Sequence, residues 1–201
     1  MKIKKNFKIV AFFGPDGSGK SLLVNELVKL LKSRNIPCIK FHWRPRILLT
    51  INKNFKNLKF NKPNNLKQRN IFFSFFLYIF FFLDFKINEF IIIKKNQKKI
   101  ILYERYYYDV LIHPRRYKLS QIDWLGKFFS GLLLKPDYSV LLYGDAKSIY
   151  SRKKELGIDE INKQMKLYNK IIPKLSNMIK LNTTKNRIFV LKTLLFRKLT
   201  K

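Results

Sequence analysis

The sequence predicts an α/β fold in which a parallel sheet of five strands is covered by helices on both faces. Short apolar runs of strand length alternate along the chain with longer segments of helical spacing. Parallel strands need such crossover segments. In addition, the first apolar run ends in a glycine-rich segment that leads directly into a helical pattern. We therefore expect three layers, with the sheet between two layers of helices, in a single domain from 1 to 201.

The elements follow one another in a regular order. Apolar runs predict strands at residues 7–13, 38–41, 100–103, 138–143 and 187–191. Helical spacing predicts helices at 20–31, 66–94, 122–134, 147–155 and 159–180. Between the last two helices, segment 151–159 is basic and contains Arg152 and Gly157. This composition is expected of a mobile, phosphate-binding lid, although an ordinary solvated helix end has it too.

The most apolar stretch covers residues 71–93 and is the only candidate for a membrane span. Its uninterrupted apolar run, 75–83, is far shorter than the roughly 20 residues that a spanning helix needs. We expect no membrane span and interpret the stretch as a buried helix, with peripheral membrane contact as the alternative.

The chain is strongly basic, with a formal net charge of +31. Such a charge attracts nucleotides, nucleic acids and anionic lipids alike, so it does not select a partner. The basic residues are spread from Lys2 to Lys201, and A/T-rich codons would enrich lysine in this way; we therefore expect no specific nucleic-acid partner. The single cysteine, Cys38, and an N-terminus without a signal-peptide pattern favour a cytoplasmic protein.

A phosphate-binding loop (P-loop) is the most informative motif. The pattern G-x-x-x-x-G-K-[ST] is met, after a predicted strand and before a predicted helix, by Gly14-Pro15-Asp16-Gly17-Ser18-Gly19-Lys20-Ser21. Glycines such as Gly14, Gly17 and Gly19 let backbone N–H groups, including that of Ser18, approach phosphate oxygens. Lys20 would bridge the β- and γ-phosphates of ATP, and Ser21 would offer its hydroxyl to Mg²⁺. The alternative is a purely structural glycine turn.

Glu104 and Arg105 follow the predicted strand 100–103 directly. They would lie at its carboxyl end, where ligands bind in open α/β sheets. Glu104 could take part in the magnesium shell, and the guanidinium of Arg105 suits phosphate oxygens. A surface ion pair at a strand end is the alternative.

These motifs, in this order and spacing, resemble the thymidylate kinase family, and more closely its thymidylate-kinase-like branch. The likeness spans most of the chain. It implies a P-loop NTPase fold, a role in nucleotide biosynthesis and a tendency to form homodimers. By this resemblance, Asp16 contacts the acceptor's sugar hydroxyl, and Glu104-Arg105-Tyr106 replaces the family's Asp-Arg-Tyr, with Arg105 on the acceptor phosphate and the transferred group. Tyr106 could stack on the base of the acceptor, although aromatic residues beside a sheet are more often part of the core. Asp145-Ala146 resembles the family's next motif.

The resemblance also implies that the catalytic cation comes from the lid, as Arg152, because Ser18 leaves the P-loop without another basic residue. Arg44, or else Arg46, is expected to bind the acceptor monophosphate. After Tyr106 the chain departs from the better-known enzymes: it has Asp109, then Ile112-His113-Pro114, where they have a Ser and then Ala-Tyr-Gln. Asp109 is expected to contact the acceptor. This departure leaves the base of the acceptor open.

The sequence thus predicts magnesium-assisted transfer of the γ-phosphoryl of ATP to a nucleoside monophosphate, thymidylate first. A kinase for another phosphate-bearing or sugar-linked molecule is one alternative. A P-loop ATPase that binds nucleic acid through its charge is a second, and a degenerate, non-catalytic relative is a third.

Overall fold

The computed structural model describes residues 8–43, 70–117, 119–120, 122–171, 177–184, 192–193 and 195–197. Its contacts divide the chain into two compact units, which are described separately. The first comprises Met1–His42, Ile93–Tyr106 and Lys135–Lys201; the second comprises Trp43–Ile92 and Tyr107–Leu134. The expectation of a single domain from 1 to 201 stays a prediction.

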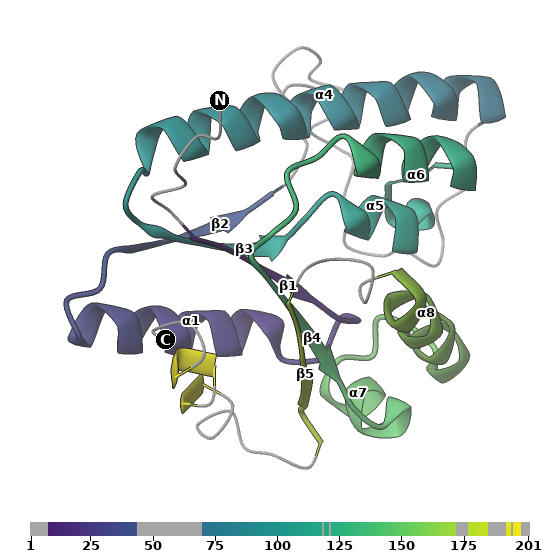
Figure 1. Ribbon diagram of the computed structural model, residues 1–201. Coiled ribbons are helices and arrows are strands. Elements are labelled where there is room, and N and C mark those ends of the chain that lie inside the picture. The colour runs from purple at the N-terminus through teal and green to yellow at the C-terminus, as the bar shows by residue number, and fades with distance from the viewer. Residues whose placement is uncertain are drawn as a thin grey trace. The chain divides into compact units, whose positions relative to one another are not determined.

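The first unit is built on a five-stranded parallel sheet with the order β2-β3-β1-β4-β5 (Figure 1). Its strands are β1 (Lys8–Phe13), β2 (Cys38–His42), β3 (Ile100–Arg105), β4 (Tyr138–Tyr143) and β5 (Met178–Asn182). The chain passes from β1 to the edge strand β2 and returns to β3, which lies beside β1. It then crosses to the other side of β1, where β4 and β5 follow. Ligands of open α/β sheets bind where the direction reverses in this way, at the carboxyl ends of the strands. The predicted α/β fold class with five parallel strands is confirmed.

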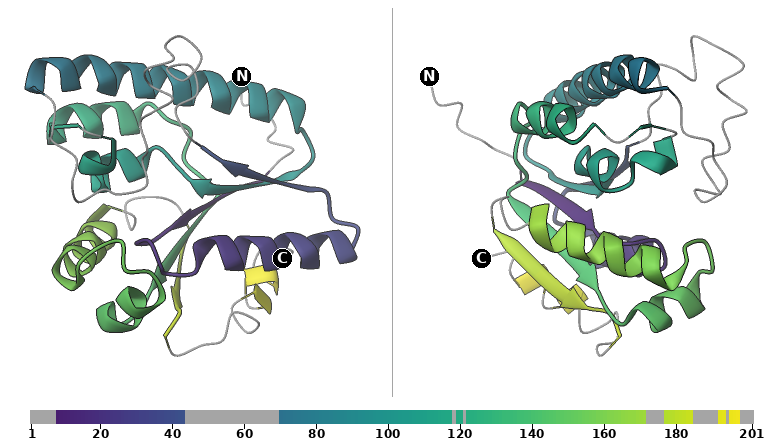
Figure 2. Two further views of the ribbon diagram at one scale, coloured as in Figure 1. Left: turned by 180° about the vertical axis from the view of Figure 1, so that it is seen from behind. Right: turned by 90° about the vertical axis from the view of Figure 1, so that its right-hand side faces the viewer.

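Three helices of the first unit position the candidate site. Helix α1 (Lys20–Ser33) follows β1 and buries Leu23, Leu27 and Leu31 against the sheet, where they meet Phe12 and Leu142. Helices α7 (Ala146–Arg152) and α8 (Ile158–Ile171) lie side by side (Figure 2). They share a small apolar core made of Ala146, Ile149, Leu156 and Ile161.

The end of the chain differs from the expectation. The helix predicted at 159–180 ends at Ile171, and β5 occupies Met178–Asn182 and pairs with β4. In β5 the buried Ile179 and Leu181 alternate with the exposed Lys180, which is the period of two expected of a strand. The strand has only five residues and polar flanks, so this period is easily missed in the sequence. The strand predicted at 187–191 lies outside the described residues.

The second unit contains α4 (Ile71–Lys95), α5 (Tyr108–Ile112), the short 3₁₀ helix η2 (Pro114–Tyr117) and α6 (Asp123–Gly131). Its core is aromatic: the Trp43 ring meets Phe85 edge to face at 5.2 Å, and its Nε1 donates to Asp84 at 3.0 Å. Within the part of the chain that the structure describes, no helix is both long and apolar enough to cross a membrane.

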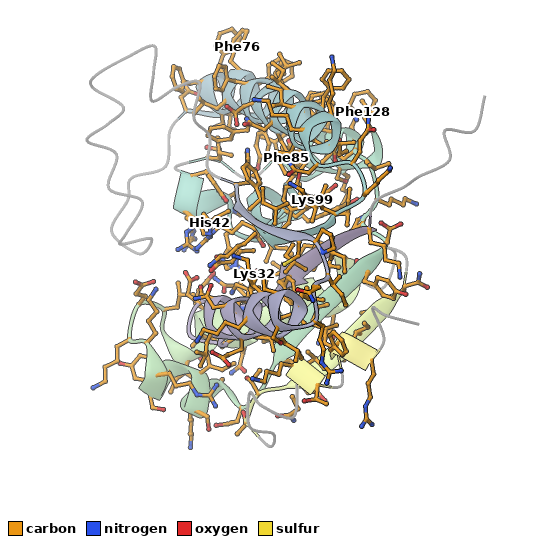
Figure 3. All side chains as sticks on the ribbon, turned by 90° about the vertical axis from the view of Figure 1, so that its left-hand side faces the viewer. Lys32, His42, Phe76, Phe85, Lys99 and Phe128 are labelled. Carbon is orange, nitrogen blue, oxygen red and sulfur yellow. The ribbon has the colours of Figure 1, made fainter. Side chains whose placement is uncertain are left out.

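The interpretation of 71–93 as a buried helix is correct for one side of α4 only. Phe81 and Phe85 are buried, whereas Phe76 and Phe90 are 53% and 67% exposed. In Figure 3, Phe76 points outward from α4 while Phe85 lies on its inner side. The helix therefore carries an apolar outer face as well as an apolar inner one.

Candidate active site

The P-loop connects β1 to α1 and adopts a conformation that requires glycine. Gly14, Gly17 and Gly19 have φ values of +139°, +85° and +89°, which side chains disfavour. A Cβ on Gly14 would lie 2.5 Å from the carbonyl oxygen of Leu142, and one on Gly17 would lie 2.8 Å from that of Ile149. The loop is thus packed between β4 and α7. It ends at the N-terminus of α1, whose unpaired N–H groups and positive dipole end attract phosphate.

Lys20 lies folded over the loop that precedes it. Its Nζ donates to the carbonyl oxygens of Gly14, at 2.5 Å, and Pro15, at 2.8 Å, and is 3.5 Å from the Ser18 hydroxyl. A lysine side chain has four rotatable bonds, so the ammonium can leave these carbonyls for an anion bound at the loop. The predicted role of Lys20 at the ATP phosphates fits this position.

Ser21 and Glu104 meet between α1 and the end of β3. The Ser21 hydroxyl donates to Oε1 of Glu104, while Lys40 Nζ and His42 Nδ1 lie 2.9 Å and 3.4 Å from Oε2. Burial alone would raise the pKa of Glu104, but hydrogen bonds from His42, Ser21 and Lys40 outweigh it and hold the pKa well below its usual range. The carboxylate is therefore ionised at neutral pH.

This pair fits the chemistry of Mg²⁺, which prefers hard oxygen donors such as a hydroxyl and an ionised carboxylate. Among the described residues there is no group of three or more His, Cys, Asp and Glu side chains that could hold a metal ion. Magnesium in kinase sites is commonly held by one or two protein oxygens together with the substrate phosphates. Ser21 and Glu104 are the residues that would hold it.

Asp16 and Arg105 form the second pair at this edge of the sheet. Nη2 of Arg105 lies 3.4 Å from Oδ1 of Asp16, and the two side chains are 16% and 9% exposed. Because β1 and β3 are neighbouring parallel strands, the segments after them lie together. The structure thus brings together, as an ion pair, two residues that the resemblance assigns to the acceptor.

The predicted lid segment, 151–159, covers the end of α7, the turn that follows it and the start of α8, and its role as a lid stays a prediction. Arg152 is exposed at the end of α7, and its Nη2 donates to the carbonyl oxygen of Thr183 at 2.8 Å. In this conformation its guanidinium is held by the turn after β5. Asp145 caps α7 by accepting from the Ser148 N–H at 2.9 Å, and this hydrogen bond lowers the pKa of its carboxyl. Asp145 therefore has a structural role.

The remaining predicted acceptor residues are placed less completely. Tyr106 is fully buried, and its ring packs edge to face on Tyr103 at 5.1 Å. Asp109 belongs to the second unit, where it is buried in α5. Arg44 and Arg46 lie outside the described residues. The roles of these residues toward an acceptor stay predictions.

Three residues of the site escaped the sequence analysis. Lys40 and His42 stand two positions apart on β2, so they lie on one side of the strand, and this spacing is the signal that could have pointed to Glu104. Tyr168 of α8 donates its hydroxyl to the carbonyl oxygen of Gly14 at 3.1 Å. No local sequence pattern indicates this hydrogen bond, because the two residues are 154 positions apart.

The sequence matches the family model described as thymidylate kinase over residues 12–195. No curated protein matches it at a significant level. Among solved structures, the fold is similar to a thymidylate kinase from Ehrlichia chaffeensis, with a TM-score of 0.63 and 19% identity, over 96% of this chain and 98% of that one. The family model covers most of the chain, P-loop and β3 end included, and the chain belongs to the thymidylate kinase family.

Proposed function

We propose that this chain phosphorylates thymidylate at the expense of ATP, with Mg²⁺. The observation that carries the proposal is the joint placement of the P-loop, the Ser21–Glu104 pair and the Asp16–Arg105 pair at neighbouring strand ends. Membership of the thymidylate kinase family supports the reaction.

In this reaction an oxygen of the acceptor monophosphate attacks the γ-phosphorus of ATP, the bond from that phosphorus to the β–γ bridging oxygen breaks, and ADP leaves. The P-loop N–H groups and Lys20 bind the β- and γ-phosphates. Ser21 and Glu104 would hold magnesium, which neutralises phosphate charge when it is bound. Catalysis then consists mainly of positioning and charge neutralisation.

The acceptor side is assigned to Asp16, Arg105, Tyr106, Asp109 and Arg44. Asp16 would accept a hydrogen bond from the sugar hydroxyl, and Arg105 would contact the acceptor phosphate and the transferred group. Arg152 is proposed as the lid cation, which has to leave Thr183 to reach the phosphates. The departure after Tyr106 keeps a kinase for another nucleoside monophosphate, or for a sugar-linked phosphate, as the second candidate.

The test is an ADP-release assay at moderate salt with Mg²⁺, ATP and a panel of nucleoside monophosphates, thymidylate included. Release with thymidylate and not with the others is the expected result. The matched control is Lys20→Ala, which should lose turnover while keeping its fold. ATP binding without release across the whole panel would contradict the thymidylate assignment and point to another acceptor.

We also infer a homodimer formed through α4, whose exposed apolar residues have coiled-coil spacing. Six apolar residues follow one another at alternating intervals of three and four positions: Phe73, Phe76, Phe80, Leu83, Ile87 and Phe90. Of these, all but the half-buried Phe80 are between 43% and 67% exposed. An exposed row of apolar residues with this alternation can form the seam by which one helix packs on another, so a second copy of α4 is the partner that it suits.

We place the enzyme in the cytoplasm. Cys38 is a free thiol on β2, partly accessible to solvent, and a free thiol persists in a reducing compartment.

A further inference from the structure

The P-loop is held from α8 by a single buried tyrosine. Tyr168 is 1% exposed, and its hydroxyl donates to the carbonyl oxygen of Gly14 at 3.1 Å. We propose that Tyr168 is a positioning residue that keeps this carbonyl hydrogen-bonded when Lys20 moves from the loop to the ATP phosphates. The inference rests on the proposed role of the P-loop in ATP binding.

The Gly14 carbonyl oxygen accepts hydrogen bonds from two side chains. A carbonyl oxygen has two lone pairs, and Gly14 offers them to two donors, the Lys20 ammonium at 2.5 Å and the Tyr168 hydroxyl at 3.1 Å. To bind β- and γ-phosphates, Lys20 has to give up its bond. Without another donor, the buried Gly14 carbonyl would then lack a hydrogen bond in the ATP-bound state only. This cost would weaken ATP binding. The hydroxyl of Tyr168 removes that cost.

Gly14 cannot respond by turning away. Its φ of +139° is a glycine conformation, and the space beside its Cα is already taken by the Leu142 carbonyl oxygen. The loop is therefore closely packed at Gly14, and this packing restricts a turn of its carbonyl. Tyr168 meets that carbonyl from α8, which is packed on α7 through Ile149 and Ile161.

Helix α7 and the residue that follows it also contact the middle of the loop. Gly17 lies against the Ile149 carbonyl oxygen and the Cβ of Lys153, at the start of the lid. The pair α7 and α8 thus touches the P-loop at Gly17 and at Gly14. Tyr168 supplies the polar half of this contact, and it links the helix after the lid to the phosphate site.

The test is a pair of ATP-binding measurements in two backgrounds, made by calorimetry with Mg²⁺ and without acceptor. Tyr168→Phe removes only the hydroxyl. In the wild-type background we expect ATP affinity to fall by about five- to tenfold, the usual effect of one lost neutral hydrogen bond. In a Lys20→Ala background the loss should shrink to less than about twofold, because the Gly14 carbonyl then lacks the lysine both with and without ATP.

A general loosening of the fold would lower ATP affinity equally in both backgrounds, and that result would overturn the proposal. So would an unchanged affinity of Tyr168→Phe in the wild-type background. The matched control is Tyr150→Phe, on α7 and packed on the same small core, which should leave ATP affinity unchanged. Because no acceptor is present, the outcome does not depend on whether thymidylate is the substrate.

Discussion

Glu104 shows at the scale of one residue how the neighbours of a side chain determine its charge. One carboxylate oxygen accepts from Ser21, and the other is shared by Lys40 and His42. Lys40 is a cation and His42 is a potential one. Removing the carboxylate would therefore leave Lys40 without its buried counter-charge. The same carboxylate is proposed to hold magnesium. Stability and function therefore depend on one group.

Glu104→Gln should lower the free energy of unfolding at neutral pH by about 1 to 3 kcal/mol, because a charge-assisted pair loses one partner. The folded-state pKa of Glu104 lies below its ordinary value of 4.5, so its contribution is present above pH 4.5 and is lost as the pH falls toward the folded-state pKa. The difference in the free energy of unfolding between wild type and variant should accordingly be present at neutral pH and narrow as the pH falls below 4.5. Urea unfolding across this pH range measures it; a difference that grows on acidification would contradict the assigned ionisation.

At the scale of elements, the P-loop, which follows β1, packs against α7, which follows β4. Gly17 is the residue that allows it, since its φ is +85° and a Cβ would meet Ile149 and Lys153. Gly157, at the far end of the lid, has open space around its Cα. These two glycines differ in their surroundings, although one lies in the P-loop and the other in the predicted lid segment.

Gly17→Ala should therefore raise the KM for ATP at least about tenfold and lower the thermal midpoint, since strain at a positive φ and a backbone clash cost about 1 to 3 kcal/mol. Gly157→Ala is the matched control and should change neither quantity appreciably. Steady-state kinetics at varied ATP and a thermal melt of both variants provide the measurement. Equal behaviour of the two variants would show that the P-loop does not need its contact with α7.

The elements also show what the sequence could and could not predict. The P-loop was predictable because its glycines, Lys20 and Ser21 act within eight successive positions. The contacts of Lys40 and His42 with Glu104 were not predicted, because they form only when β2 and β3 pair in the sheet. The exposed face of α4 was missed for another reason: apolar residues surround that helix on nearly all sides, so no periodicity indicates which side faces solvent. Local patterns survive in sequence, whereas contacts between distant segments do not.

At the scale of the whole molecule, the apolar stripe of α4 predicts that two chains associate. A chain of 24.2 kDa should elute with twice that mass in size-exclusion chromatography with light scattering at micromolar concentration. The double variant Phe76→Asp, Leu83→Asp places charges in the centre of the stripe and should yield monomers, because burying unpaired carboxylates against a second helix is unfavourable. Ile71→Asp is the control: Ile71 is 66% exposed on the same helix but lies off the alternating spacing, so the dimer should persist. A wild-type chain that stays monomeric would contradict the dimer. Binding of that chain to anionic vesicles would then identify the stripe as a surface that contacts lipid.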